Sequence, residues 1–275
     1  MQTTTESPLW RITRNIILIT ATLAVVFPYF WITLTSIKPP DLVAHPDVWL
    51  FSPAWDNWQE VLFESDVPHN LLNSILVGSA AVLIALLVGS PAAYSFSRFR
   101  TGGPGVRFGI LAAQMVPPAI LIIPLFLIMY HTRLLDTLWA VIAAHLTFVL
   151  PMVTWFLIGF FDEVPVELEE QAMVDGCTHF QAFYRVVLPV VRPGLAASAI
   201  FGFVLSWNDM FYSLLLTGGD AKTLPAAISG FWTFRGIELG KMSVAVMIAI
   251  VPVLIASFFI QRYLVRGLGA GAVKA

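Results

Sequence analysis

The sequence predicts an all-α membrane protein with six transmembrane helices and both termini on the cytoplasmic side. Of its 275 residues, 58% are hydrophobic and only 12% are charged, whereas soluble domains carry about 25% charged residues. The apolar residues gather in six long stretches, and the basic residues are shared unequally between the connections. A surface so poor in charge is suited to lipid and to neighbouring helices more than to water.

Six stretches approach the length of about 20 apolar residues that a membrane-spanning helix needs. Five contain no Asp, Glu, Lys or Arg and lie between Arg14 and Lys38, His69 and Arg98, Arg107 and Arg133, Asp136 and Asp162, and Lys241 and Arg262. The sixth, 193–217, is interrupted only by Asp209. We expect one helix in each. The first run is longer than the 7–15 residues of a signal-peptide core, so it is expected to be a span.

Lys and Arg in the connections set the orientation of such a bundle. With the termini inside, ten of the 15 basic residues fall on the inner side and five on the outer side. The first outer loop, 37–69, is rich in proline and tryptophan. It either folds over neighbouring helices or contacts an external partner protein.

Composition also excludes several classes of function. A net charge of −2 and a pI near 6.2 argue against nucleic acid as a partner. The single cysteine, Cys177, cannot form an intrachain disulfide, and the five histidines have no zinc-ligand spacing. The Gly218–Thr223 segment lacks the second glycine of a phosphate-binding loop, so we expect a turn, no nucleotide site and no enzyme activity in this chain.

Small residues recur at helical spacing in the second stretch and predict close helix packing. They are Gly78, Ala81, Ala85, Gly89 and Ala92.

The inner loop 162–192 is marked by several helix signals. Pro165 suits a first helical position, and Asp175-Gly176 suits a helix stop with a left-handed glycine. Thr178 and Gln181 have the spacing of a capping box that begins a second helix, and Pro189 is expected to end it. The loop should therefore be two helices joined by a sharp turn.

The second of these helices has an apolar face made by Phe180, Phe183, Tyr184 and Val187. This stripe has to be buried on the protein's own bundle, on the membrane surface or in a groove of a soluble partner. The acidic first turn of the hairpin disfavours an anionic membrane surface.

The same loop resembles the EAA loop of the membrane subunits of binding-protein-dependent ATP-binding-cassette (ABC) importers. The family pattern is Glu-Ala-Ala, three residues, Gly, nine residues, and Ile-x-Leu-Pro. Here it is Glu170-Gln171-Ala172, Gly176 and Val186-Val187-Leu188-Pro189. The spacing is complete, and Gln171 and Val186 depart from the pattern. Asn73-Ser74, Ser206-Trp207-Asn208-Asp209 and the tail after Gly267 resemble the carbohydrate branch, of the maltose-transport type.

The resemblance implies a type I ABC importer fold and a division into 1–69, a transmembrane core 70–266 with the coupling loop 162–192, and a cytoplasmic tail 267–275. It implies four kinds of partner in a bacterial cytoplasmic membrane: a second homologous permease, an ATPase dimer that binds ATP and Mg²⁺, an external solute-binding protein and the lipid bilayer. The implied cargo is a sugar or sugar derivative. The residues implied in coupling are Glu170, Ala172, Asp175, Gly176, Phe180, Phe183, Leu188 and Pro189. The tail either reaches the ATPase or is unstructured.

Polar side chains within the spans are candidates for the solute pathway, since an ionisable group in a span usually faces a cavity or a partner. Asp209 is the one acid within an expected span, and Trp207 and Asn208 add a ring and an amide suited to a sugar. Asn73 and Gln114 are further candidates. Each of these residues could instead hold helices together, and His145 is expected to be a packing residue. A permease for a non-sugar solute and a stand-alone channel or carrier remain alternatives.

Overall fold

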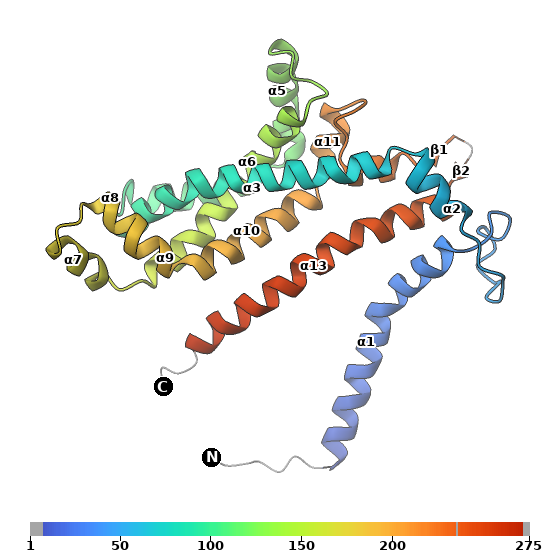
Figure 1. Cartoon of the computed structure of the whole chain (residues 1–275), viewed down its shortest axis with the longest axis horizontal. Coiled ribbons are helices and arrows are strands. Elements are labelled where there is room, and N and C mark those ends of the chain that lie inside the picture. Colours follow the sequence, from blue (N-terminus) through green and yellow to red (C-terminus); the bar gives the residue numbers. More distant parts are fainter. Residues whose placement is uncertain (1–7, 235, 272–275) are drawn as a thin grey trace. The chain divides into compact units, whose positions relative to one another are not determined.

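The computed structural model describes residues 8–234 and 236–271, and within them the chain is helical apart from one short hairpin (Figure 1). The hairpin pairs β1 (Trp232–Thr233) with β2 (Gly236–Ile237). This confirms the predicted helical class. The chain divides into two compact units, Met1–Asp66 with Gly230–Ile248 and Val67–Ser229 with Ala249–Ala275.

The first unit contains α1 (Pro8–Ser36), α2 (Asp56–Gln59), the π-helical turn η1 (Glu60–Glu64), the hairpin and the beginning of α13 (Leu239–Gly271). Lys38 is buried after α1, where its Nζ donates to the His45 carbonyl at 2.7 Å. The same ammonium lies 5.9 and 5.6 Å from the ring centres of Trp31 and Phe51. Part of the outer loop is therefore folded onto its own unit.

The second unit holds the remaining helices. They are α3 (Val67–Arg98), α4 (Gly103–Gln114), α5 (Pro118–His131), α6 (Leu138–Asp162), α7 (Glu167–Val174), α8 (His179–Ala182), η2 (Phe183–Val187), α9 (Leu188–Val190), α10 (Arg192–Trp207), α11 (Phe211–Leu216) and α12 (Leu224–Ser229).

The core of the second unit lies between α3, α6 and α10, which pack along one another. The small residues of α3 make this possible. Ala81 and Ala85 are fully buried. A Cβ on Gly89 would lie 2.7 Å from Oγ1 of Thr154, and one on Gly78 would lie 3.0 Å from the Phe203 ring. The packing role predicted for this stripe is confirmed.

In the part of the chain that the structure describes, four helices have the length and apolarity of a membrane span: residues 9–36, 67–98, 138–162 and 239–258. The count reaches six if each of two bent helix pairs is one span. One of these pairs corrects the expectation of a single helix over 108–132, since α4 and α5 meet at 87°. Pro117 is extended, with φ −60° and ψ 136°, because a residue before proline is disfavoured in the α region.

The expectation of one continuous helix over 193–217 is also wrong. The helix α10 ends at Trp207, and α11 begins at Phe211. Asp209 therefore lies in the break between two helices and not inside one. Its Oδ1 accepts a hydrogen bond from the Tyr212 N–H at 3.1 Å, so its side chain satisfies an amide at the start of α11.

The C-terminal tail is expected at 267–275, either reaching the ATPase or unstructured. In the structure, α13 continues to Gly271. Residues 272–275, with Lys274, lie outside the described residues, as does Arg235.

Candidate functional site

The turn between α7 and α8 has the geometry that its sequence predicts. Gly176 has φ +87°, the Cys177 N–H donates to the Ala172 carbonyl at 2.9 Å, and the Gly176 N–H donates to the Met173 carbonyl at 3.0 Å. These two bonds are a Schellman motif. Thr178 and Gln181 form the reciprocal capping box of α8. Pro165 precedes α7 by two residues and does not occupy its first position.

A buried ion pair fixes α7 to the end of α3. Nε of Arg98 contacts Oε1 of Glu169, and both side chains are less than 10% exposed. Oε2 of Glu169 accepts a hydrogen bond from the Tyr94 hydroxyl at 2.8 Å. Nη2 of Arg98 donates to the Val164 carbonyl at 2.7 Å. One guanidinium therefore holds both α7 and the chain that enters it.

The apolar stripe of the second helix is divided along its length. Phe183 and Val187 are buried in the core, where the Phe183 ring centre lies 4.7 Å from that of Tyr94. Phe180 and Tyr184 are 71% and 53% exposed, with their ring centres 4.9 Å apart. The helix thus anchors one edge of its stripe in its own bundle and leaves the other edge open.

The second helix of the loop ends one residue after Pro189, beside the position where its end is expected. The helical run continues through the π-helical turn η2 into α9 and reaches Val190, and α10 follows at 74°.

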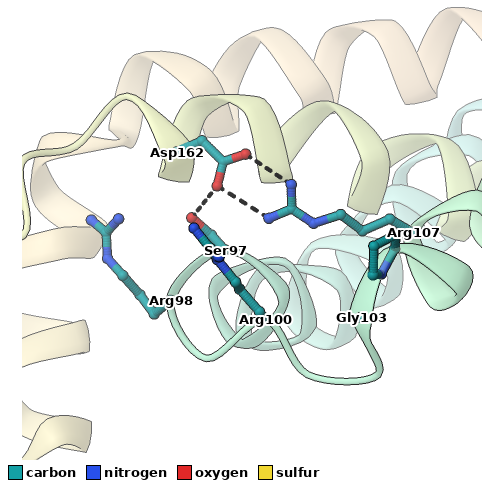
Figure 2. Close-up of a pocket in the computed structure, with 7 residues that line it drawn as sticks. Ser97, Arg98, Arg100, Gly103, Arg107 and Asp162 are labelled. Atoms are coloured by element: carbon teal, nitrogen blue, oxygen red, sulfur yellow. Dashed lines mark hydrogen bonds and ion pairs between the residues drawn. The ribbon is translucent and has the colours of Figure 1, made fainter.

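A second charged cluster joins the ends of α3, α4 and α6. Asp162 accepts hydrogen bonds from Ser97 and from the Arg107 guanidinium, with Arg107 Nη1 at 3.2 Å (Figure 2). Arg107 also donates to the Phe96 carbonyl at 2.8 Å. These side chains, with Arg98, Arg100, Gly103 and Pro104, line a cavity of about 630 Å³. The loop 162–192 therefore begins at a residue that is bonded to both α3 and α4.

The residues picked out by the sequence pattern differ in burial. Glu170, Asp175, Gly176 and Phe180 are exposed, Ala172 and Phe183 are buried, and Leu188 and Pro189 are intermediate. The pattern did not single out Arg98 or Glu169, which carry the buried pair. The available signal was a basic residue at the end of one span and an acid beside the patterned Glu170.

A smaller cavity of about 280 Å³ brings together three of the pathway candidates. Gln114, Asn208 and Asp209 line it with Thr147 and Tyr212. The Gln114 amide donates to the Phe148 carbonyl at 2.7 Å, and that of Asn208 donates to the Val204 carbonyl at 2.8 Å. Among the described residues, none donates a hydrogen bond to Oδ2 of Asp209.

His145, expected to be a packing residue, lies beside Asp209. Its Nε2 is 3.2 Å from Oδ1 of Asp209, without the alignment of a hydrogen bond, and its Nδ1 is 2.6 Å from Oγ of Ser206. The imidazole is fully buried. It is therefore a buried neighbour of the Asp209 carboxylate.

Two other pathway candidates lie elsewhere. Asn73 donates to the carbonyls of Asp220 and Lys222 at 2.7 and 3.0 Å. Trp207 is buried, stacks on Phe203 and donates to the Ala249 carbonyl at 3.2 Å.

Gly218 and Gly219 form a turn, and both N–H groups donate to Asp136 at 3.1 Å. Among the described residues no group of His, Cys, Asp and Glu is arranged to hold a metal ion.

The loop 162–192 and the second unit, to which it belongs, correspond to a known family. The model of the binding-protein-dependent transport system inner membrane component matches residues 81–269. The chain belongs to this family. It is thus a multi-pass membrane component of a transport system.

Several relatives of this transport component cover almost its whole length. The diacetylchitobiose uptake system permease protein DasC of Streptomyces coelicolor is 33% identical over 270 residues, 96% of this chain and 97% of the relative. The trehalose transport system permease protein SugB of Mycobacterium tuberculosis is 34% identical, over 90% and 92% of the two chains. The sulfoquinovosyl glycerol transport system permease protein SmoH of Agrobacterium fabrum is 31% identical, over 97% and 94%.

A solved structure shares the fold of this transport component. It is a chain of a bacterial ABC transporter involved in the import of the acidic polysaccharide alginate. The TM-score is 0.77 with 21% identity, and the match covers 95% of this chain and 99% of the other. The fold is therefore that of an ABC importer permease.

Proposed function

We propose that this chain is a permease subunit of an ATP-driven importer for a sugar or sugar derivative. It forms half of the translocation pathway, together with a second homologous permease. The relatives that carry sugar-related names support the cargo class, since they match nearly the whole chain. ATP and Mg²⁺ are bound by a partner ATPase dimer, and an external solute-binding protein delivers the cargo.

The observation that carries the proposal is the divided stripe of the loop 162–192. Its buried edge fixes the helix to the bundle, and its open edge presents Phe180 and Tyr184 away from that core. Exposed aromatic side chains on a rigid helix suit a groove on a soluble partner. The exposed carboxylates of Glu170 and Asp175 suit basic side chains at the edge of such a groove.

The coupling role covers the residues of the loop pattern: Glu170, Ala172, Asp175, Gly176, Phe180, Phe183, Leu188 and Pro189. The exposed members contact the ATPase, and the buried members keep them in place. Six spans with both termini in the cytoplasm put this loop on the side where ATP is found.

For the solute we propose the cavity at Gln114, Asn208 and Asp209. A carboxylate and two amides can bind several hydroxyl groups, and Tyr212 adds a ring beside them. Asn73 and Trp207 instead hold protein contacts.

The first test is purification of the tagged chain from native membranes in mild detergent, followed by mass spectrometry. We expect one second permease and two ATPase copies for each chain. Recovery of the chain alone, or as a homo-oligomer, would favour a channel or carrier.

The natural Cys177 gives a second measurement at the same site. It is the one cysteine of the chain and follows the Gly176 turn. Maleimide should label it in the isolated chain and react more slowly once the ATPase is bound. Equal labelling rates would contradict docking of this turn.

Uptake by proteoliposomes containing the whole complex, tested with diacetylchitobiose, trehalose and sulfoquinovosyl glycerol, then examines the cargo class.

A further inference from the structure

The inference rests on the proposed function and concerns how movement at the ATPase reaches the solute pathway. Within the second unit, α7 contacts α3 through the ion pair of Arg98 and Glu169. Both side chains are less than 10% exposed, so separating them would leave charges that their surroundings solvate poorly. A separation would leave an uncompensated buried charge. The contact therefore resists being pulled apart.

Tyr94 strengthens this contact from the same helix. Its hydroxyl donates to Glu169 at 2.8 Å, and its ring packs against Phe183 of the second loop helix. The end of α3 thus holds both helices of the loop, one through a carboxylate and one through an aromatic ring. Neither loop helix can shift without displacing this end of α3.

The opposite end of α3 is fixed to the segment that follows α11. Asn73 donates to the carbonyls of Asp220 and Lys222, and Oγ of Ser74 accepts from the Leu224 N–H at 2.7 Å. These polar side chains are buried. Between Asn73 and Arg98 the chain is one helix, about 38 Å long at 1.5 Å per residue.

The segment held by Asn73 leads back to the cavity. It follows α11 directly, and Asp209 accepts a hydrogen bond from the Tyr212 N–H at the beginning of that helix. A displacement of α3 along its axis therefore moves the chain on which the Asp209 cavity is built.

From this geometry we infer that Arg98 and Glu169 are positioning residues, and that their ion pair is the joint that transmits movement of α7 to α3. The patterned Glu170 is exposed and suited to the partner, whereas its neighbour Glu169 points inward and suits transmission within the subunit. Of these two adjacent acids, Glu170 is thus assigned to contact with the partner and Glu169 to transmission of movement within the subunit.

The test uses the whole importer in proteoliposomes and measures solute imported per ATP hydrolysed. Glu169→Gln keeps the size of the side chain but removes its charge. We expect import per ATP to fall about tenfold, within the range of known coupling energies, while ATP hydrolysis continues. Glu167→Gln, an exposed change in the same turn of α7, is the matched control and should behave as wild type.

A double-mutant cycle tests whether Arg98 and Glu169 act on import per ATP through their ion pair or independently of each other. Arg98→Gln should lower import per ATP as Glu169→Gln does, and the double variant should fall no further. A purely structural pair would reduce the amount of assembled complex but leave import per ATP unchanged, which would overturn the inference. Additive losses in the double variant would overturn it as well.

The importer proposal and the proposed role of the Arg98–Glu169 pair can be tested separately. If the wild-type complex shows no ATP-driven uptake, the importer proposal and the joint both fall. If the wild type imports solute and Glu169→Gln has normal import per ATP, only the joint falls.

Discussion

Glu169 and Asp209 both lie inside the second unit, yet their surroundings differ. Glu169 has both carboxylate oxygens bound, to Arg98 and Tyr94, and its side chain is 6% exposed. Asp209 contacts His145 and the Tyr212 N–H through Oδ1 and lines a cavity of about 280 Å³. The carboxylate of Glu169 is enclosed by its partners, whereas that of Asp209 can still accept hydrogen bonds through Oδ2 at the cavity.

This difference separates two uses of a carboxylate. A carboxylate whose acceptors are all occupied stabilises one arrangement of helices. A carboxylate that is fixed on one side and open on the other is able to bind a ligand. We therefore assign transmission to the Glu169 region and solute contact to the Asp209 region, and four substitutions test that assignment.

The largest effect is expected at the turn that directs the coupling loop. Gly176→Val should abolish uptake and coupled ATP hydrolysis while the chain still inserts into the membrane. A β-branched residue is strained at φ +87°, although a Cβ would meet no atom within 4 Å. Gly176→Asn is the matched control, since asparagine tolerates this conformation better, and it should retain part of the uptake. Normal uptake by the valine variant would contradict the coupling assignment.

Phe180→Ala should weaken binding of the ATPase about tenfold, as expected for truncation of an aromatic interface residue. Titration of the purified ATPase onto the permease complex measures this. Phe108→Ala removes an equally exposed ring from α4 and should leave the affinity unchanged. The same loss in both variants would point to general damage and not to docking.

Asp209→Asn should raise the KM for solute about tenfold, because one charge-assisted hydrogen bond becomes neutral. Import per ATP should remain near that of the wild type, in contrast to Glu169→Gln. Uptake measured across solute concentrations, with ATP hydrolysis recorded in parallel, provides both values. A fall in import per ATP without a change in KM would reverse the roles given to the two acids.

The smallest effect is expected for Tyr94→Phe. It removes the hydroxyl that donates to Glu169 and should lower the free energy of unfolding by about 1–2 kcal/mol, measured as a shift of the denaturation midpoint of the complex. Tyr130→Phe, at an exposed position on α5, is the control. An unchanged midpoint in Tyr94→Phe would show that Arg98 alone holds the carboxylate.

The two regions also differ in how far the sequence predicted them. The Gly176 turn and the capping box of Thr178 and Gln181 were predicted correctly because their hydrogen bonds join residues five or fewer positions apart. The broken spans were missed. Both breaks have local signals: Pro117-Pro118 at the first, and at the second Asp209, whose carboxylate accepts from the Tyr212 N–H three positions along the chain.

By itself the sequence determined the helical membrane class, the small-residue face of α3 and the double helix of the coupling loop. Hydropathy, residue size and helix caps act over one or two turns, so they can be read along the chain. Only the tertiary structure decided that Glu169 pairs with Arg98, 71 positions away, that His145 lies beside Asp209, and that Phe183 is buried while Phe180 stays exposed. Those outcomes depend on which helices meet, and a buried charge or ring is satisfied by whichever neighbour the packing brings to it.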